Sequence, residues 1–139
     1  MPIERGNKAV EDAAIAWVLT FERREGRDPR DTRYDGPSPA DIVSPPRTIE
    51  VKAFGNAARG NDLWFEVPQF EEARRNPQFY LYVVENIRQG HPEQFTLKIL
   101  AGVRLARLLD RARERRYFTV PWPVSDYDLP TFNTKNEEA

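Results

Sequence analysis

A Pro45-Pro46 pair between two short apolar runs constrains the fold of this chain more than any other feature. Proline fixes its own backbone angle and has no N–H to donate to a strand, so such a pair favours a tight turn. After the pair, Thr48-Ile49-Glu50-Val51-Lys52 alternates between polar and apolar types, which is typical of a strand. The pattern predicts a hairpin with strands over residues 40–44 and 48–54.

The second strand of this hairpin carries an acid and a lysine at the same parity. Glu50 and Lys52 are therefore expected on one face of the sheet, and their apolar neighbours on the other. If the turn folds the first strand back, Asp41 comes near Glu50. Two carboxylates beside a lysine can hold a hard divalent cation and steer a water molecule. The same residues could instead be cross-strand charges on an exposed face, contributing less than about 1 kcal/mol.

The composition limits what kind of site the chain can build. Its 139 residues, 40% of them hydrophobic, are enough for one compact core. We expect a single domain over residues 1–125 and a polar, mobile tail over residues 126–139. There is no cysteine and His91 is the single histidine, so a metal would have to be bound by oxygen atoms.

Charge and hydropathy exclude two further classes. The sequence has 21 basic and 22 acidic residues and a net charge of −1, so it lacks the overall positive field of small nucleic-acid binders. Contact with nucleic acid would have to use local patches. No apolar run approaches the length of a membrane span, and the N-terminus has no signal-peptide core, so we expect a cytoplasmic protein without a membrane partner.

Hydrophobic periodicity predicts a mixed α/β domain with one twisted sheet. A long amphipathic helix is expected to run through about Arg24, with Glu11 half buried at the edge of its apolar face. The continuous apolar run over residues 79–84 favours a strand that is covered on both faces at the centre of the sheet. The other expected elements are a strand over 63–67, a helix over 68–75, a strand over 95–99 and a helix over 102–116.

Several side chains outside the hairpin have two interpretations. Arginines at spacings of three or four would form a stripe on the last helix, either as a solvated face or as a track for phosphates. They are Arg104, Arg107, Arg111 and Arg115. Gln69 could touch a substrate or cap the short helix. Trp122 is expected to pack within an extended segment rather than to stack on bases.

The chain resembles the C-terminal domain of the plant protein NO VEIN, a family that looks like a branch of the PD-(D/E)xK nucleases. The resemblance covers most of residues 6–100. It rests on the helical Glu11, on Asp41-Ile42, on the strand Ile49-Glu50-Val51-Lys52-Ala53, on the segment from Phe65 to Ala73, and on the run Tyr80-Leu81-Tyr82-Val83-Val84.

The resemblance implies a restriction-endonuclease-like fold, in which helices flank a mixed, twisted sheet, and it implies roles for residues. Asp41 and Glu50 would bind Mg²⁺, or Mn²⁺ in its place, with the Val51 carbonyl completing the set. Lys52 would orient the attacking water and offset charge in the transition state. Glu11 would position Lys52 or help to hold a second ion.

Two functions follow as hypotheses. The first is a Mg²⁺-dependent nuclease that hydrolyses DNA, with RNA left open as a substrate, acting in bacterial defence or DNA processing as a homodimer or within a larger complex. The second is a catalytically inactive module of the same fold that binds nucleic acid or a protein.

Overall fold

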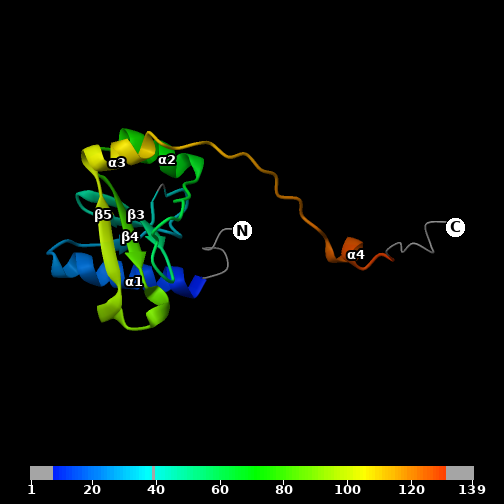
Figure 1. The fold of residues 1–139 in the computed structure, drawn as a ribbon, viewed down its shortest axis with the longest axis horizontal. Helices are drawn as coiled ribbons and strands as arrows, with labels where there is room; N and C mark the ends of the chain where they lie inside the picture. Colours follow the sequence, from blue (N-terminus) through cyan, green and yellow to red (C-terminus); the bar gives the residue numbers. More distant parts are fainter. Residues whose placement is uncertain (1–7, 39, 131–139) are drawn as a thin grey trace.

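The computed structural model describes residues 8–38 and 40–130. Five strands form one sheet in the order β1-β2-β3-β4-β5, with helices on both sides (Figure 1). The elements are α1 (Lys8–Arg24), β1 (Arg30–Asp31), β2 (Ile42–Ser44), β3 (Arg47–Ala53), α2 (Val67–Arg75), β4 (Phe79–Glu85), the 3₁₀ turns η2 (Ile87–Gln89) and η3 (Pro92–Gln94), β5 (Thr96–Leu100), α3 (Gly102–Leu109) and α4 (Val124–Tyr127). This arrangement confirms the expected fold class, a mixed α/β sheet flanked by helices.

The predicted hairpin is present. Strands β2 and β3 are antiparallel, with Ile42 opposite Ile49, and the turn between them holds Pro45 and Pro46. Strand β3 is parallel to β4, and β4 is antiparallel to β5. Strand β1 is a two-residue edge strand that periodicity did not reveal, because two residues are too short for an alternating pattern.

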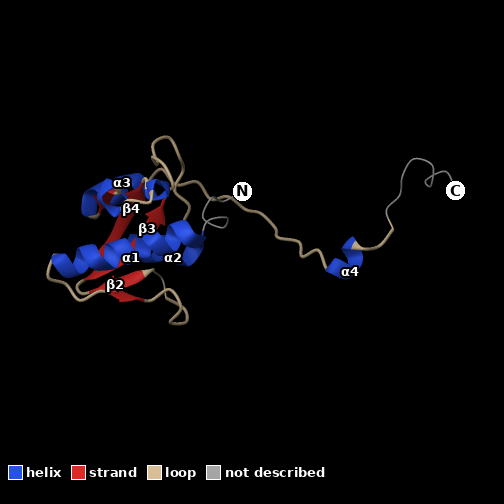
Figure 2. Cartoon of the chain, turned by 90° about the horizontal axis from the view of Figure 1, so that it is seen from below, coloured by secondary structure: helices blue, strands red, loops and turns tan. Residues whose placement is uncertain are grey.

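The sheet separates two apolar layers (Figures 1 and 2). On one face α1 packs its buried residues, among them Ile15 and Val18, against Ile49, Val51 and Tyr82. The opposite face is covered by α2 and α3. Its buried cluster includes Leu81, Val83, Leu105 and Leu109. Strand β4 contributes to both clusters, which confirms that the run over residues 79–84 is covered on both faces, although β3 is the middle strand of the five.

The strand expected over residues 63–67 is wrong. Residues 63–66 form an irregular segment that leads into α2, and Val67 is the first residue of that helix. Leu63 and Phe65 are half buried against the cluster under α2 and α3, whereas Trp64 is 48% exposed. The alternation of apolar and polar residues therefore records packing onto the face of the sheet, not pairing with a neighbouring strand.

The helix expected over residues 102–116 is too long, because α3 ends at Leu109. Leu105 and Leu109 are its buried residues, and Ala112 is exposed. Charged residues dominate positions 110–116, so a continued helix would have no apolar face to bury. Trp122 is 71% exposed and meets Tyr127 at a ring distance of 5.2 Å, so the expected packing of this tryptophan into the fold is wrong.

Within residues 8–38 and 40–130, no helix is both long enough and apolar enough to cross a bilayer. Of the tail expected over residues 126–139, residues 131–139 lie outside the described part of the chain.

Candidate active site

Asp41 lies immediately before β2, where the hairpin joins its loop. Its backbone N–H donates to the carbonyl of Ile49 at 3.0 Å, and its carboxylate Oδ2 accepts the backbone N–H of Val51 at 2.9 Å. The carboxylate is therefore fixed beside the middle of β3. Burial raises the pKa of Asp41, while the Val51 N–H and the Lys52 charge oppose the rise.

Glu50 is the buried acid of the site. The register of β3 places its side chain on the face covered by α2 and α3, opposite to Ile49 and Val51. The residue is 2% exposed, and its Oε2 lies 3.0 Å from Lys52 Nζ. Its other oxygen, Oε1, is buried without a hydrogen-bond partner among the residues that the structure describes. A buried carboxylate oxygen is costly to leave unpaired, so this atom is available to a ligand.

The pKa of the Glu50 carboxyl is raised to about 8. Burial is the largest cause, because it disfavours the charged form. The ammonium of Lys52 opposes the rise, whereas the nearby charges of Asp41 and Glu11 add to it. Three acids and one lysine therefore act on one another electrostatically, as expected if Asp41 comes near Glu50.

Lys52 is held in a partly apolar setting. Its side chain is 11% exposed, and Nζ lies 4.8 Å from the ring centroid of Phe65. A cation over an aromatic face is stabilised by the ring quadrupole. The irregular segment that replaces the expected strand therefore supplies the residue that covers the lysine. Phe65 belongs to the resemblance but was not predicted to be near Lys52, since sequence spacing does not reveal a contact between a loop and a strand.

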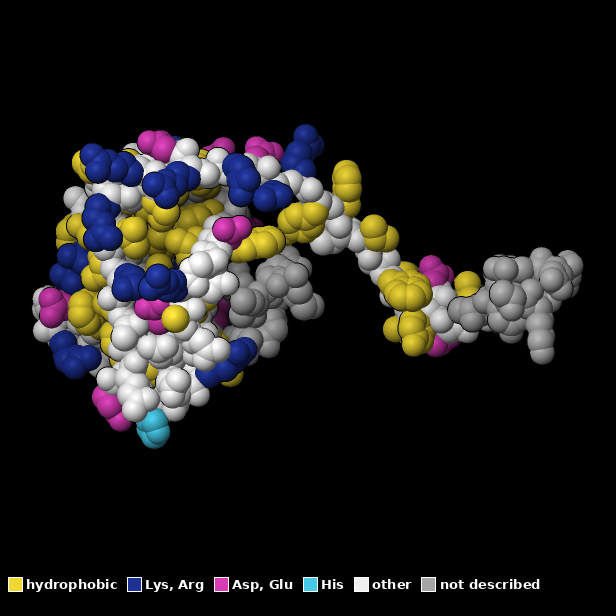
Figure 3. All heavy atoms as spheres, in the orientation of Figure 1, with side chains coloured by type: hydrophobic (Ala, Val, Ile, Leu, Met, Phe, Trp, Pro, Cys, Tyr) yellow, Lys and Arg dark blue, Asp and Glu magenta, His cyan; other side chains and the backbone are white. Residues whose placement is uncertain are grey.

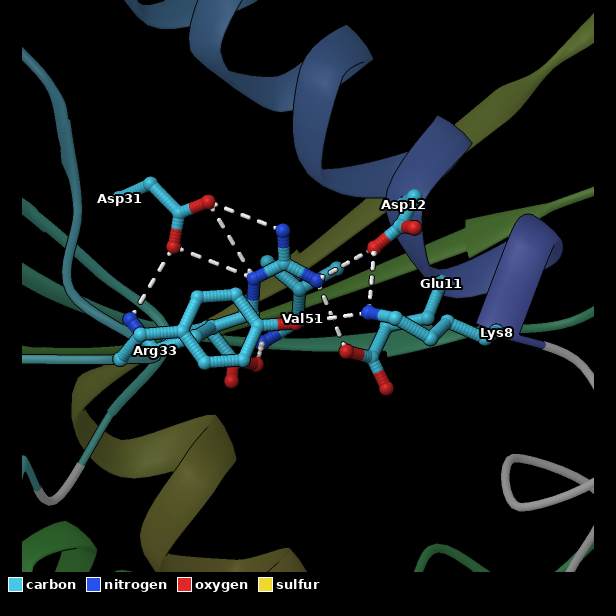
Figure 4. Close-up of polar contacts among 8 residues, drawn as sticks. Lys8, Glu11, Asp12, Asp31, Arg33 and Val51 are labelled. Carbon is cyan, nitrogen blue, oxygen red and sulfur yellow. Dashed lines mark hydrogen bonds and ion pairs between the residues drawn. The ribbon is translucent and has the colours of Figure 1, made fainter.

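Glu11 approaches the site from the first turn of α1, and its carboxylate is 40% exposed. Its Oε1 accepts a hydrogen bond from Arg33 Nη1 at 2.8 Å. The same nitrogen of Arg33 donates to Asp12 at 2.8 Å, and its Nη2 donates to Asp31 at 2.9 Å. Figure 4 shows the guanidinium between Asp31 on one side and Asp12 and Glu11 on the other. Glu11 thus pairs with Arg33, and it acts on Asp41 and Glu50 through its charge.

The donor set fits a hard cation in its chemistry. Two carboxylates and the Val51 carbonyl are oxygen ligands of the kind Mg²⁺ prefers. In the two described stretches, 8–38 and 40–130, no group of three or more histidine, cysteine, aspartate or glutamate side chains is gathered closely enough to hold a metal. Any cation here would therefore use Asp41 and Glu50 together with backbone and solvent oxygens.

The expected arginine stripe is broken by the early end of α3. Arg104 and Arg107 lie on that helix, but Arg111 and Arg115 follow it in a segment without regular structure. All four side chains are exposed. Lys and Arg side chains still gather over α2 and α3 (Figure 3). Asp110, at the end of α3, is paired with Arg74 of α2 at 2.7 Å.

Gln69 caps α2, which was the favoured interpretation of this residue. Its side-chain oxygen accepts the backbone N–H of Glu66 at 3.2 Å. A glutamine three residues after the cap position commonly makes this bond. Contact between Gln69 and a substrate stays a prediction.

Two polar residues were missed. Arg33 lies in a stretch that reads as a loop, so nothing in the pattern marked it. Glu22 is 0% exposed and binds Arg27, Ser44 and Tyr82. A signal existed for Glu22: it follows the buried Val18 by four residues, so it lies on the buried side of α1.

Comparison with known families shows that one family model covers most of these elements. The family model "Protein NO VEIN, C-terminal" matches residues 10–97, more than half of the chain. The matched stretch contains Glu11, Asp41, Glu50 and Lys52 and ends before α3. No curated protein and no solved structure gives a significant match.

Proposed function

Because this chain belongs to the family of the NO VEIN C-terminal domain, we propose that it is a Mg²⁺-dependent nuclease domain that hydrolyses phosphodiester bonds of DNA in the cytoplasm. In this proposal the sheet and its helices are those of a restriction-endonuclease-like fold. Mn²⁺ would replace Mg²⁺, and bacterial defence or DNA processing is the setting.

One observation supports the proposal above the others: Glu50 is buried where the charge of Asp41 acts on it, and one of its oxygens has no hydrogen-bond partner in the described parts of the chain, 8–38 and 40–130. A purely structural ion pair would use both carboxylate oxygens, because desolvated oxygens without hydrogen bonds cost stability. A cation that is held by Glu50 and Asp41 would compensate this oxygen. It would also favour the ionised form of Glu50, which burial disfavours.

The chain's residues would divide the chemistry among them. Asp41 and Glu50 would hold Mg²⁺ through carboxylate oxygens, with the Val51 carbonyl as a third ligand. When bound, the ion supplies a Lewis acid that acidifies water and neutralises phosphate charge. Lys52 would orient the attacking water and offset charge developing on the phosphoryl oxygens. Glu11, held by Arg33, would contribute negative charge at the edge of the site.

DNA would be gripped by local positive charge, since the net charge of −1 gives no overall attraction. Arg104 and Arg107 on α3 are the first candidates, and Arg111 and Arg115 extend the basic region beyond the helix. Gln69 would touch the substrate only in addition to capping α2. RNA is an alternative substrate, because the roles proposed for Asp41, Glu50 and Lys52 concern the phosphate and not the sugar.

The test is cleavage of plasmid and of single-stranded DNA and RNA in Mg²⁺ or Mn²⁺. We expect wild-type cleavage that chelators abolish, and a loss of at least about 100-fold in Lys52→Ala, since a positioned charge at the transition state has effects of this size. Lys98→Ala, which removes an exposed lysine of β5, is the matched control and should cleave as the wild type does. Equal cleavage by the wild type and Lys52→Ala would exclude this mechanism.

A second function, a catalytically inactive module that binds nucleic acid or a protein, is favoured by two contacts. Lys52 is engaged by Glu50 at 3.0 Å, and Glu11 is engaged by Arg33 at 2.8 Å. Both acids would then be neutralised without a metal. Mg²⁺ titration separates the two functions: a metal site raises the melting temperature as Mg²⁺ increases, whereas an idle one leaves it unchanged.

A further inference from the structure

The segment over residues 117–123, between α3 and α4, is apolar but uncovered. We call it the C-terminal arm. Phe118 is 94% exposed, Val120 83% and Trp122 71%. The arm follows α3 and runs away from the sheet (Figures 1 and 2), with hydrophobic side chains exposed along it (Figure 3). Large apolar side chains in such a row mark a surface that is covered by a partner.

The sequence of the arm suits a strand at the edge of a sheet. Phe118, Val120 and Trp122 alternate with the other residues, so in an extended strand they share one face. Pro121 and Pro123 have the opposite parity. Because the N–H groups of alternate residues point to opposite edges of a strand, both prolines block the same edge. The other edge, to which the N–H groups of Phe118, Val120 and Trp122 point, keeps all three donors and can pair.

The open edge of the sheet at β5 is a candidate partner for the arm. The hydrogen bonds of β3 determine which residues of β5 direct their backbone groups outward at this edge. Thr48 donates its N–H to the carbonyl of Gln78 at 2.8 Å, and Phe54 donates to Val84 at 2.9 Å. Even-numbered residues of β4 therefore direct their backbone groups toward β3. Odd-numbered residues of β4 must direct theirs toward β5.

This parity decides which backbone groups of β5 are unpaired. Val83 of β4 is opposite Lys98, so even-numbered residues of β5 bond to β4. The N–H and C=O groups of Leu97 and Ile99 point outward, and within the described chain β5 has a neighbour strand on one side only. The side chains of Leu97 and Ile99 pack against the apolar cluster under α1.

We propose that the C-terminal arm pairs antiparallel with β5 of a second copy of this chain, so that two copies exchange arms. In an antiparallel pair, residues that exchange hydrogen bonds lie directly opposite and on the same face. Pairing the free edge of the arm with Leu97 and Ile99 therefore aligns its apolar side chains with the apolar face of β5. The backbone and the side chains thus demand the same register parity, which a parallel pairing would not satisfy.

A second copy fits better than the arm's own domain because the arm extends away from that domain. Reciprocal exchange also covers the open β5 edge of each copy with the arm of the other copy, as in domain-swapped dimers. Each buried aromatic ring removes about 150–250 Å² from water. Two arms with Phe118, Val120 and Trp122 each, together with the surfaces that they cover, reach the roughly 1,200–2,000 Å² of a stable interface.

The experiment measures the mass of the full chain by light scattering and sedimentation over a range of concentrations. We expect a dimer in the wild type. Val120→Pro removes an N–H from the pairing edge and should raise the dimer Kd at least about tenfold, because it deletes a ladder hydrogen bond and forces the adjoining pair apart. Thr119→Pro adds a proline to the edge that is already blocked and should leave the Kd within about twofold.

Both substitutions lie in the exposed arm and should leave the fold of the domain intact. At concentrations low enough for both variants to be monomeric, their melting curves by circular dichroism should therefore coincide. A wild type that is monomeric at every concentration overturns the proposal, even if its Trp122 fluorescence indicates a buried ring, since the arm would then fold onto its own domain. Equal weakening of the dimer by Val120→Pro and Thr119→Pro also overturns it, because the edge of the arm would not matter.

Discussion

Glu50 combines features that a structural glutamate rarely has. It is almost fully buried, it faces a lysine, and one of its oxygens has no partner within residues 8–38 and 40–130. The raised pKa of Glu50 follows from burial and from the neighbouring acids. The metal-free protein therefore carries a destabilising group at the centre of the site, and such strain is common where a ligand binds.

The first prediction concerns pH. Below its ordinary pKa of 4.5 the Glu50 carboxyl is protonated in both the folded and the unfolded chain, whereas between 4.5 and about 8 only the folded chain keeps the proton. The free energy of unfolding should therefore fall as pH rises through this window, by on the order of a few kcal/mol. Glu50→Gln should lack this loss. Denaturant unfolding at pH 5, 7 and 9 in the presence of a chelator measures the free energy of unfolding of the wild type and of Glu50→Gln. If the two proteins showed the same dependence on pH, the burial of an ionisable group at this position would be contradicted.

The second prediction concerns Arg33, whose side chain is 12% exposed among three acids. Arg33→Ala leaves Glu11, Asp12 and Asp31 without their shared cation, so we expect a loss of about 1–3 kcal/mol in unfolding free energy. Arg30→Ala is the matched control, because Arg30 is exposed and 3.9 Å from its partner Asp35. That variant should change stability by less than about 0.5 kcal/mol. Similar losses in both would show that the cluster contributes no more than surface charge.

Sequence reasoning predicted that Asp41, Glu50 and Lys52 lie near one another, because strand parity and the proline turn determine their placement almost alone. The two positions of β3 share a face by the period of a strand, and the proline turn returns Asp41 to Val51. Arg33 could not be found in this way. Its importance comes from a contact between a loop and the start of α1, 22 residues away in sequence, and no local pattern encodes such a contact.

Among the elements, α1 is tied to the sheet by a buried polar network as well as by apolar packing. Glu22 of α1 accepts hydrogen bonds from Ser44 of β2 at 2.9 Å and from Tyr82 of β4 at 2.6 Å. Arg27, which follows the helix, pairs with the same carboxylate. The arginine and these hydrogen bonds lower the pKa of Glu22 despite its burial. This network lies on the α1 face of the sheet, whereas Glu50 and Lys52 lie on the other.

The third prediction tests this network. Tyr82→Phe removes the hydroxyl that donates to Glu22 and accepts from Arg47 Nη1 at 2.6 Å. We expect a loss of about 1–3 kcal/mol, because a buried carboxylate loses a donor. Tyr80→Phe is the control, since the ring that Arg47 covers at 4.2 Å is retained. Equal stability of the Tyr82 variant and the wild type, measured by denaturant unfolding, would show that Arg27 and Ser44 satisfy Glu22 without this hydroxyl.

The elements that sequence reasoning misplaced have one physical cause. Periodicity reports which residues are buried, but not what buries them. Residues 63–67 alternate because Leu63 and Phe65 pack onto the sheet face, and the same alternation would arise in a strand. The helix over residues 102–116 was extended too far because Ala112 continues the helical spacing of Leu105 and Leu109, whereas α3 ends at its last buried leucine.

At the scale of the complete fold, the class and the order of α1, the hairpin, α2, β4, β5 and α3 followed from sequence, but the layers did not. The strand order and the parallel pairing of β3 with β4 depend on crossovers through α2, which local patterns do not determine. This arrangement puts Glu50 and Lys52 on one face, with Phe65 against Lys52, and it brings Glu11 to the edge from the other layer. The proposed site therefore forms only when both layers are in place.

A crystal of the protein soaked in Mn²⁺ tests whether these groups share one cation. Anomalous scattering locates the ion without reference to activity. We predict a single strong peak within about 2.0–2.3 Å of carboxylate oxygens from both Asp41 and Glu50 and near the Val51 carbonyl. We also expect the peak to disappear in Glu50→Gln. Saturating Mn²⁺ with no peak at this position, and with the Glu50–Lys52 pair unchanged, would contradict the assignment of a metal-dependent nuclease.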